Sequence, residues 1–224
     1  MFEKYRKIAL ATFAGIFATA LGVIGMQEKV PLIGGGEVVA PVAQVQESDE
    51  AKFVYAMETV IKHEGGLSNH KSDRGKITKY GISLRYLINE KFDLNNDGAI
   101  NDADIIHLTR TEADKIYYRE WYKKHRYDEI VNKDILTDIM DFSINVGATQ
   151  CHKTLKRAIN RIISDPIEVD GDFDNDTIEI VNLIEPMVLH EALNQEQEAF
   201  YRGLVKKNPA LSVFLDGWLK RSRD

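Results

Sequence analysis

The chain has 224 residues, of which 44% are hydrophobic, and its formal net charge is −6. A chain of this length can bury one good core or two small ones, and its acidic balance excludes a basic nucleic-acid-binding protein. The single cysteine, Cys151, excludes an internal disulfide, and we predict that it is a small buried core residue and not a metal ligand.

The N-terminal segment, residues 1–26, is predicted to meet a membrane. Lys4, Arg6 and Lys7 precede nineteen uncharged residues, 8–26, about the length that crosses a bilayer as a helix. Ten of the nineteen are Ala, Gly or Thr, so the segment is only marginally apolar. A permanent anchor, a signal peptide cleaved near residues 18–20, and a segment that can leave the membrane intact all remain open. The positive-inside rule places its N-terminus in the cytoplasm.

The next segment, residues 27–50, shows neither a helical nor an alternating pattern. Pro31, Pro41 and three consecutive glycines, residues 34–36, interrupt it. This composition predicts a flexible linker that gives the following domain reach.

Helical periodicity dominates from residue 51 onward. Apolar residues at helical spacing, among them Phe53, Met57 and Val60, predict a helix that ends before Gly65 and Gly66. Further helical patterns cover residues 111–125, 133–144, 152–164, 177–183 and 187–207. Strand signals are few, and the clearest is a short extended piece at residues 78–83. The sequence therefore predicts a mainly α fold with a small β element.

Glu64 is the main candidate for a catalytic residue. It ends the first predicted helix, and Gly65 and Gly66 after it would let a substrate approach the backbone. Hydrolysis of a glycosidic bond needs a carboxylic acid with a raised pKa that protonates the leaving oxygen, and a second polar group facing it. The alternative is a solvated acid at a helix end, followed by an ordinary glycine cap.

Residues 93–104 match the spacing of a twelve-residue calcium loop. Oxygen-bearing side chains stand at positions one, three and five, Gly98 stands at position six, and position seven offers its carbonyl. The predicted ligands of Ca²⁺ are Asp93, Asn95, Asp97, Ala99 and Asp104. Because position twelve is Asp and not Glu, we expect a modest affinity. The alternative is a turn rich in Asn and Asp that only caps the following helix.

The residues after Glu64 resemble a known motif. Asn69, Asp73, Gly75 and Thr78, followed by the run Tyr80-Gly81-Ile82, resemble the opening of the glycoside hydrolase family 108 lysozyme-like muramidases. Lys76 stands where relatives usually carry a second glycine, which predicts a stiffer or differently aimed loop.

The resemblance extends along the rest of the chain. Residues 116–122 resemble the aromatic helix of that family, and residues 141–147 resemble its Asp-Phe-Ala-Val-Asn-Ser-Gly segment. Residues 169–171, 200–202 and 214–218 resemble the peptidoglycan-binding domain that accompanies it.

The resemblance implies a domain order and a set of site residues. It implies a lysozyme-like helical catalytic domain at 51–148 and a helical peptidoglycan-binding subdomain at 149–224. The predicted calcium loop at 93–104 is an insertion in the catalytic domain that the family pattern does not require. Glu64 is expected to donate the proton, and Asp73 and Thr78 to stabilise charge or position the attacking water. Tyr80 and Asn145 are expected to bind the substrate.

The function implied is that of a phage endolysin. Such an enzyme hydrolyses the β-1,4 bond between N-acetylmuramic acid and N-acetylglucosamine in peptidoglycan. The family context also favours a signal-anchor-release segment at the N-terminus, which holds the enzyme at the host inner membrane and then releases it to the periplasm. We expect a monomer whose partners are peptidoglycan and that membrane, with calcium in a structural or regulatory role. The alternatives are a lytic transglycosylase and a non-catalytic, membrane-tethered peptidoglycan-binding protein.

Overall fold

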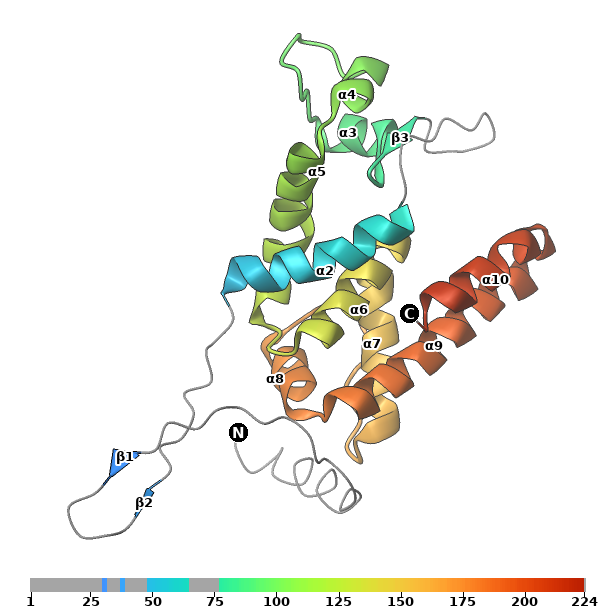
Figure 1. Cartoon of the computed structure of the whole chain (residues 1–224). Helices are drawn as coiled ribbons and strands as arrows, with labels where there is room; N and C mark the ends of the chain where they lie inside the picture. The colour runs from blue at the N-terminus through green and yellow to red at the C-terminus, as the bar shows by residue number, and fades with distance from the viewer. Residues whose placement is uncertain (1–29, 32–36, 39–47, 65–76, 224) are drawn as a thin grey trace.

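The computed structural model describes residues 30–31, 37–38, 48–64 and 77–223, and helices make up most of them (Figure 1). The α-helices are α2 (Asp49–Glu64), α3 (Leu84–Glu90), α4 (Asp102–His107), α5 (Arg110–Tyr117), α6 (Lys133–Val146), α7 (Ala148–Ile162), α8 (Asn175–Leu183), α9 (Pro186–Lys207) and α10 (Ser212–Arg221). A π-helical segment, η1 (Tyr118–Lys123), continues α5, and two short 3₁₀ segments are η2 (Tyr127–Glu129) and η3 (Pro209–Leu211). The predicted mainly α fold is confirmed.

The small β element is a hairpin of β3 (Thr78–Lys79) and β4 (Ile82–Ser83). The two strands pair antiparallel, with Thr78 opposite Ser83 and Lys79 opposite Ile82. Tyr80 and Gly81 form the two-residue turn, with φ of 51° and 77°. Positive φ at both turn residues matches the right-handed twist of the flanking strands. The extended piece predicted at residues 78–83 is confirmed.

A second pair of strands lies in the segment predicted to be a linker. Strand β1 (Val30–Pro31) pairs antiparallel with β2 (Glu37–Val38). This short ladder was not predicted. The other residues of 27–47, and the predicted membrane segment at residues 1–26, lie outside the described residues. Among the helices that the structure does describe, none is long and apolar enough to cross a membrane.

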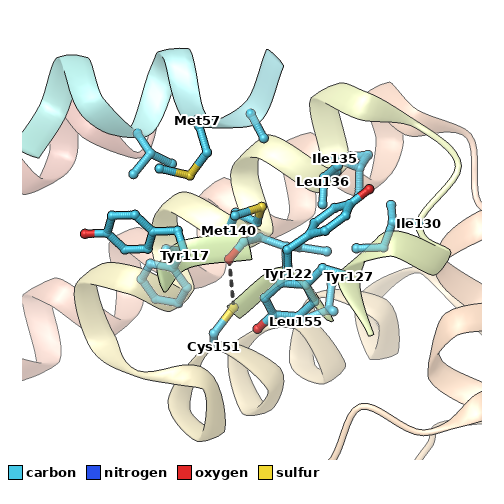
Figure 2. Close-up of a cluster of buried hydrophobic side chains, with 14 of the residues drawn as sticks. Met57, Tyr117, Tyr122, Tyr127, Ile130, Ile135, Leu136, Met140, Cys151 and Leu155 are labelled. Carbon is cyan, nitrogen blue, oxygen red and sulfur yellow. Dashed lines mark hydrogen bonds between the residues drawn. The ribbon is translucent and has the colours of Figure 1, made fainter. Parts of the chain in front are cut away.

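Helix α6 lies at the centre of the fold and packs against α2, α7 and α9. Its buried side chains include Ile135, Leu136 and Met140, which meet Met57 of α2 and aromatic residues from the η1 and η2 region (Figure 2). Cys151 on α7 is fully buried, and its Sγ lies 3.5 Å from the carbonyl oxygen of Ile139, the dashed line in Figure 2. Its predicted role as a small core residue is confirmed.

Helices α2 and α6 run in the same direction. Near their beginnings, Lys52 Nζ donates to the carbonyl oxygen of Ile130 at 3.0 Å, and the Tyr55 hydroxyl donates to Asp134 Oδ1 at 2.8 Å. Both helices therefore end on the same side of the molecule, α2 at Glu64 and α6 at Val146.

The C-terminal helices α9 and α10 form an antiparallel hairpin that projects from the body of the fold (Figure 1, orange to red). Asn208 shapes the connection, since its side chain accepts a hydrogen bond from the backbone N–H of Ala210. Arg221, the last residue of α10, donates to Asp141 of α6 from Nε at 2.7 Å and from Nη2 at 2.9 Å. This ion pair fixes the hairpin against the central helix.

Candidate active site

Glu64 occupies the position at which α2 ends. Gly65 and Gly66 follow it directly, and a helix that ends before a glycine pair matches the prediction made for this segment. Because α2 and α6 are parallel, the backbone of Glu64 lies at the same end of the helix pair as the last turn of α6, which carries Asn145 (Figure 1). The side chain of Glu64 and the whole of Asp73 lie outside the described residues.

The β3–β4 hairpin carries two of the predicted site residues, Thr78 and Tyr80, and both are partly buried. Tyr80 adopts a left-handed backbone conformation, with φ of 51°, which is strained for a bulky residue. The fully buried Tyr117 supports it, since its hydroxyl donates to the Tyr80 carbonyl oxygen at 3.0 Å. Lys79 Nζ lies 5.6 Å from the centre of the Tyr80 ring. Helix α5, through Tyr117, therefore supports the strained turn at Tyr80 and Gly81.

Asn145, the other residue predicted to bind substrate, is exposed in the last turn of α6. Its Nδ2 donates to the hydroxyl of Tyr201 on α9 at 2.6 Å. Tyr201 is only 2% exposed and stacks on Trp218 of α10. The amide of Asn145 is thus oriented by the C-terminal hairpin, a link that no sequence pattern indicated.

Two family models match the chain, one after the other. The model of glycosyl hydrolase 108 matches residues 57–147, and that of a predicted peptidoglycan domain matches residues 151–223. Residues 57–147 therefore form a glycosyl hydrolase 108 domain. The chain carries a glycoside hydrolase of the lysozyme-like kind that acts on peptidoglycan, and a peptidoglycan-binding domain follows this catalytic domain. The family resemblance read from the motif residues is confirmed.

A solved structure with a similar fold is that of Brucella abortus SagA. It superimposes with a TM-score of 0.62 at 24% sequence identity, over 78% of this chain and 91% of that chain. No curated protein sequence matches the chain.

Within the glycosyl hydrolase 108 segment, the loop predicted to bind calcium is closed by hydrogen bonds between its own residues. The backbone N–H of Gly98 donates to Asp93 Oδ2 at 2.8 Å, and that of Ala99 donates to Asp97 Oδ1 at 2.8 Å. Asn95 Oδ1 accepts from the N–H of Asp97 at 2.9 Å. The other carboxylate oxygen of Asp93, Oδ1, is buried and has no hydrogen-bond partner, an arrangement that a bound cation would satisfy.

Asp104, the predicted ligand at position twelve, makes contacts that the sequence did not indicate. Its side chain is buried, and Oδ1 accepts from the N–H of Leu94 while Oδ2 accepts from that of Asn101, at 2.9 and 2.8 Å. Burial alone would raise the pKa of Asp104, but these backbone hydrogen bonds outweigh it and hold the pKa below its usual range. In the described part of the chain, no group of three or more His, Cys, Asp or Glu side chains is placed to hold a metal ion.

A cavity of about 660 Å³ lies between the two family segments, among α2, α6, α9 and α10. Its wall carries Asp138 and His190, whose Oδ2 and Nδ1 are 2.6 Å apart. Burial raises the pKa of Asp138, and the hydrogen bond that His190 Nδ1 donates to Asp138 raises the pKa of His190. Among the predicted site residues that the structure describes, Thr78, Tyr80 and Asn145 do not line it. The cavity is therefore a feature of the junction between the two family segments.

A second buried network joins the catalytic domain to the peptidoglycan-binding domain. The Tyr127 hydroxyl lies 2.9 Å from Ser143 Oγ and 2.9 Å from His152 Nε2. His152 Nδ1 lies 2.8 Å from the carbonyl oxygen of Gly171, and since a carbonyl only accepts, Nδ1 carries the proton and Nε2 accepts from Tyr127. The two domains therefore share one polar core.

Proposed function

We propose that this glycosyl hydrolase 108 protein is a phage endolysin that hydrolyses the β-1,4 bond between N-acetylmuramic acid and N-acetylglucosamine and so lyses the host cell. The observation that carries the proposal is the position of Glu64, which ends α2 directly before a glycine pair, inside the segment that the family model matches. The last turn of α6, with Asn145, lies at the same end of the helix pair.

In the proposed reaction, Glu64 gives its carboxyl proton to the glycosidic oxygen as the bond from that oxygen to the sugar C1 breaks. Positive charge then builds on the sugar ring, and Asp73 and Thr78 stabilise it or position the water that adds to C1. The oxygen of the water forms the new bond to C1, and its proton is taken up by a carboxylate. Thr78 suits this role because it lies on the short β3–β4 hairpin, whose turn a buried tyrosine holds.

The test is product analysis of purified sacculi with the wild type and with Glu64→Gln. A muramidase releases muropeptides with free reducing ends, whereas a lytic transglycosylase releases anhydro products that are one water lighter. We expect reducing ends from the wild type and at least a 100-fold lower rate from Glu64→Gln, with an unchanged melting temperature. Anhydro products would establish the transglycosylase instead, and an active Glu64→Gln would refute the assignment of the acid.

Residues 93–104 are proposed to bind Ca²⁺ through the side chains of Asp93, Asn95 and Asp97 and the carbonyl of Ala99. The support is the buried Oδ1 of Asp93, which has no hydrogen-bond donor, since a buried carboxylate oxygen without a partner is disfavoured. In this proposal Asp104 does not bind the ion. Its carboxylate accepts from the backbone N–H groups of Leu94 and Asn101 and so holds the two ends of the loop together. Calcium then stabilises the domain and takes no part in the chemistry.

Residues 1–26 are proposed to hold the enzyme at the host inner membrane, with the N-terminus in the cytoplasm, and to release it intact to the periplasm when the membrane is depolarised. The support is the uncharged run of residues 8–26, which is long enough to span a bilayer but contains ten Ala, Gly or Thr residues. Transfer of such a segment into lipid is only slightly favourable in free energy, so depolarisation of the membrane is enough to release it.

A further inference from the structure

Three aromatic rings in the peptidoglycan-binding domain form a continuous row from the core to the surface. Tyr201 of α9 stacks on Trp218 of α10 with ring centres 5.1 Å apart and planes at 18°, and Trp218 meets Phe214 at 5.8 Å and 31°. On the inner side, Phe142 of α6 packs its edge against Tyr201. The row therefore begins in the buried core and ends at Phe214, whose side chain is 54% exposed.

The exposed end of the row lies toward the side of the molecule at which α2 and α6 end. Arg221 of α10 pairs with Asp141, and Tyr201, the partner of Trp218, binds Asn145 one turn later on α6. Helix α10 thus runs antiparallel to α6. Phe214 precedes Arg221 by two turns of α10, roughly 10 Å along the helix axis. Phe214 therefore lies toward the C-terminal end of α6. That is the end at which α2 stops at Glu64.

On the side of α10 that carries Phe214, the space at Gly217 is empty. Gly217 follows Phe214 by three residues and so lies on the same side of α10. No atom lies within 4 Å of the position that a Cβ would occupy there, so packing does not require a glycine. A glycine inside a helix is less favourable than alanine, and at position 217 it leaves the space beside it on α10 empty.

We infer that Phe214, backed by Trp218 and Tyr201, is a stacking platform for a sugar ring of the peptidoglycan glycan strand, beyond the sugars that the catalytic residues engage. This inference rests on the proposed function, since it adds a binding position for the same glycan strand. A sugar ring presents apolar C–H groups on one face, which match the face of an aromatic ring. The row belongs to the peptidoglycan-binding segment and leads to the end of α2 and α6, and both features favour a glycan strand as the occupant.

The experiment measures binding without hydrolysis. Full-length Glu64→Gln protein, kept in a mild detergent, is titrated with glycan strands from which the stem peptides have been removed. Phe214→Leu retains an apolar side chain but loses the flat ring, and it is expected to weaken binding roughly three- to tenfold. Phe214→Tyr keeps the ring and is expected to bind within twofold of the parent.

Val213 supplies the matched control. It is 77% exposed and stands next to Phe214 on α10, but it points roughly 100° away around the helix. Val213→Ala should bind glycan strands like the parent. Unchanged binding by Phe214→Leu, or equal weakening by Val213→Ala, would overturn the platform. So would a loss of self-association in Phe214→Leu seen by sedimentation, which would assign the surface to a second copy of the chain.

A second pair of variants tests the open space beside the ring. Gly217→Leu places a side chain against Phe214, while Gly203→Leu adds the same group at another open helical glycine, on α9. We expect weaker glycan binding only in Gly217→Leu, with both proteins folded by circular dichroism, and equal binding by the two would overturn the platform. Failure of the platform leaves the hydrolysis result for Glu64→Gln intact, so the two proposals fail separately.

Discussion

Arg221 and Asp141 are separated by 80 residues in the sequence and form a two-point ion pair between α10 and α6. Their side chains are 15% and 11% exposed, so the pair is largely removed from water. It crosses the boundary between the glycosyl hydrolase 108 segment and the peptidoglycan-binding segment. The contact therefore couples the position of the C-terminal hairpin to the central helix of the catalytic domain.

Replacing Arg221 by methionine is expected to destabilise the protein by about 2–4 kcal/mol, because it removes the guanidinium that pairs with the largely buried carboxylate of Asp141. Urea unfolding of the full chain measures this change. Combining Arg221→Met with Asp141→Leu removes both charges and should recover most of the loss.

Arg223 provides the comparison for that ion pair. It pairs with Glu198, but its side chain is 60% exposed, so Arg223→Met is expected to change stability by less than about 1 kcal/mol. Equal effects of the two substitutions would show that burial of the Arg221 pair has no energetic consequence.

This coupling also marks the limit of what could be predicted from the sequence. The long helices were predicted because each carries its own apolar periodicity; the pattern at 187–207, for example, corresponds to α9 at Pro186–Lys207. Helices α3, α4 and α10 were not predicted. The first two have seven and six residues, too few to show a period, and α10 contains Gly217, which interrupts the pattern.

The half-buried His125 and the buried His152 lead to a prediction about acid stability. Burial, the neighbouring His152 and then Lys124 lower the pKa of His125 to about 4, and burial lowers the pKa of His152 as well. An unfolded histidine binds a proton below about pH 6.5. Between pH 6.5 and 4 the unfolded state therefore binds more protons than the folded state, so stability falls as the pH falls.

The expected loss is at most about 1.4 kcal/mol per pH unit for each histidine. The measurement is urea unfolding at pH 5.0 and 6.5. His125→Gln should reduce the slope of stability against pH, whereas His107→Gln, at an exposed histidine in α4, should leave it unchanged. Equal slopes in all three proteins would contradict the prediction.

The sequence predicted only those parts of the candidate site whose residues lie close together in the chain. The strained turn at Tyr80 follows from a two-residue connection between short strands, so its residues lie close together in the sequence. The hydrogen bond from Asn145 to Tyr201 and the cavity beside His190 arise from segments more than 50 residues apart. Asp104 was assigned by spacing alone, which cannot distinguish a carboxylate that faces an ion from one that accepts backbone N–H groups.

Calcium is expected to raise the melting temperature of the protein through the loop at residues 93–104. At a calcium concentration ten times the dissociation constant, the stabilisation is about 1.4 kcal/mol, which corresponds to a shift of roughly 3–5 °C for a chain of this size. Differential scanning calorimetry with and without calcium measures it. Asp97→Ala, which removes the ligand at position five, should abolish the shift.

Asp102→Ala is the matched control for the loop, because Asp102 lies in the same segment but outside the predicted ligand set. It should keep the response to calcium. A shift that survives Asp97→Ala, or the absence of any shift in the wild type, would leave the loop with only its helix-capping role through Asn101.

The N-terminal segment is expected to hold the full-length enzyme in the membrane until the membrane potential collapses. Fractionation of cells before and after addition of an uncoupler should show full-length protein moving from the membrane to the periplasm. Replacing Ala14, Ala18 and Gly22 by leucine makes the segment more apolar and should keep the protein in the membrane after depolarisation. A shortened product in the periplasm would instead establish cleavage as a signal peptide, and wild-type protein that never leaves the membrane would establish a permanent anchor.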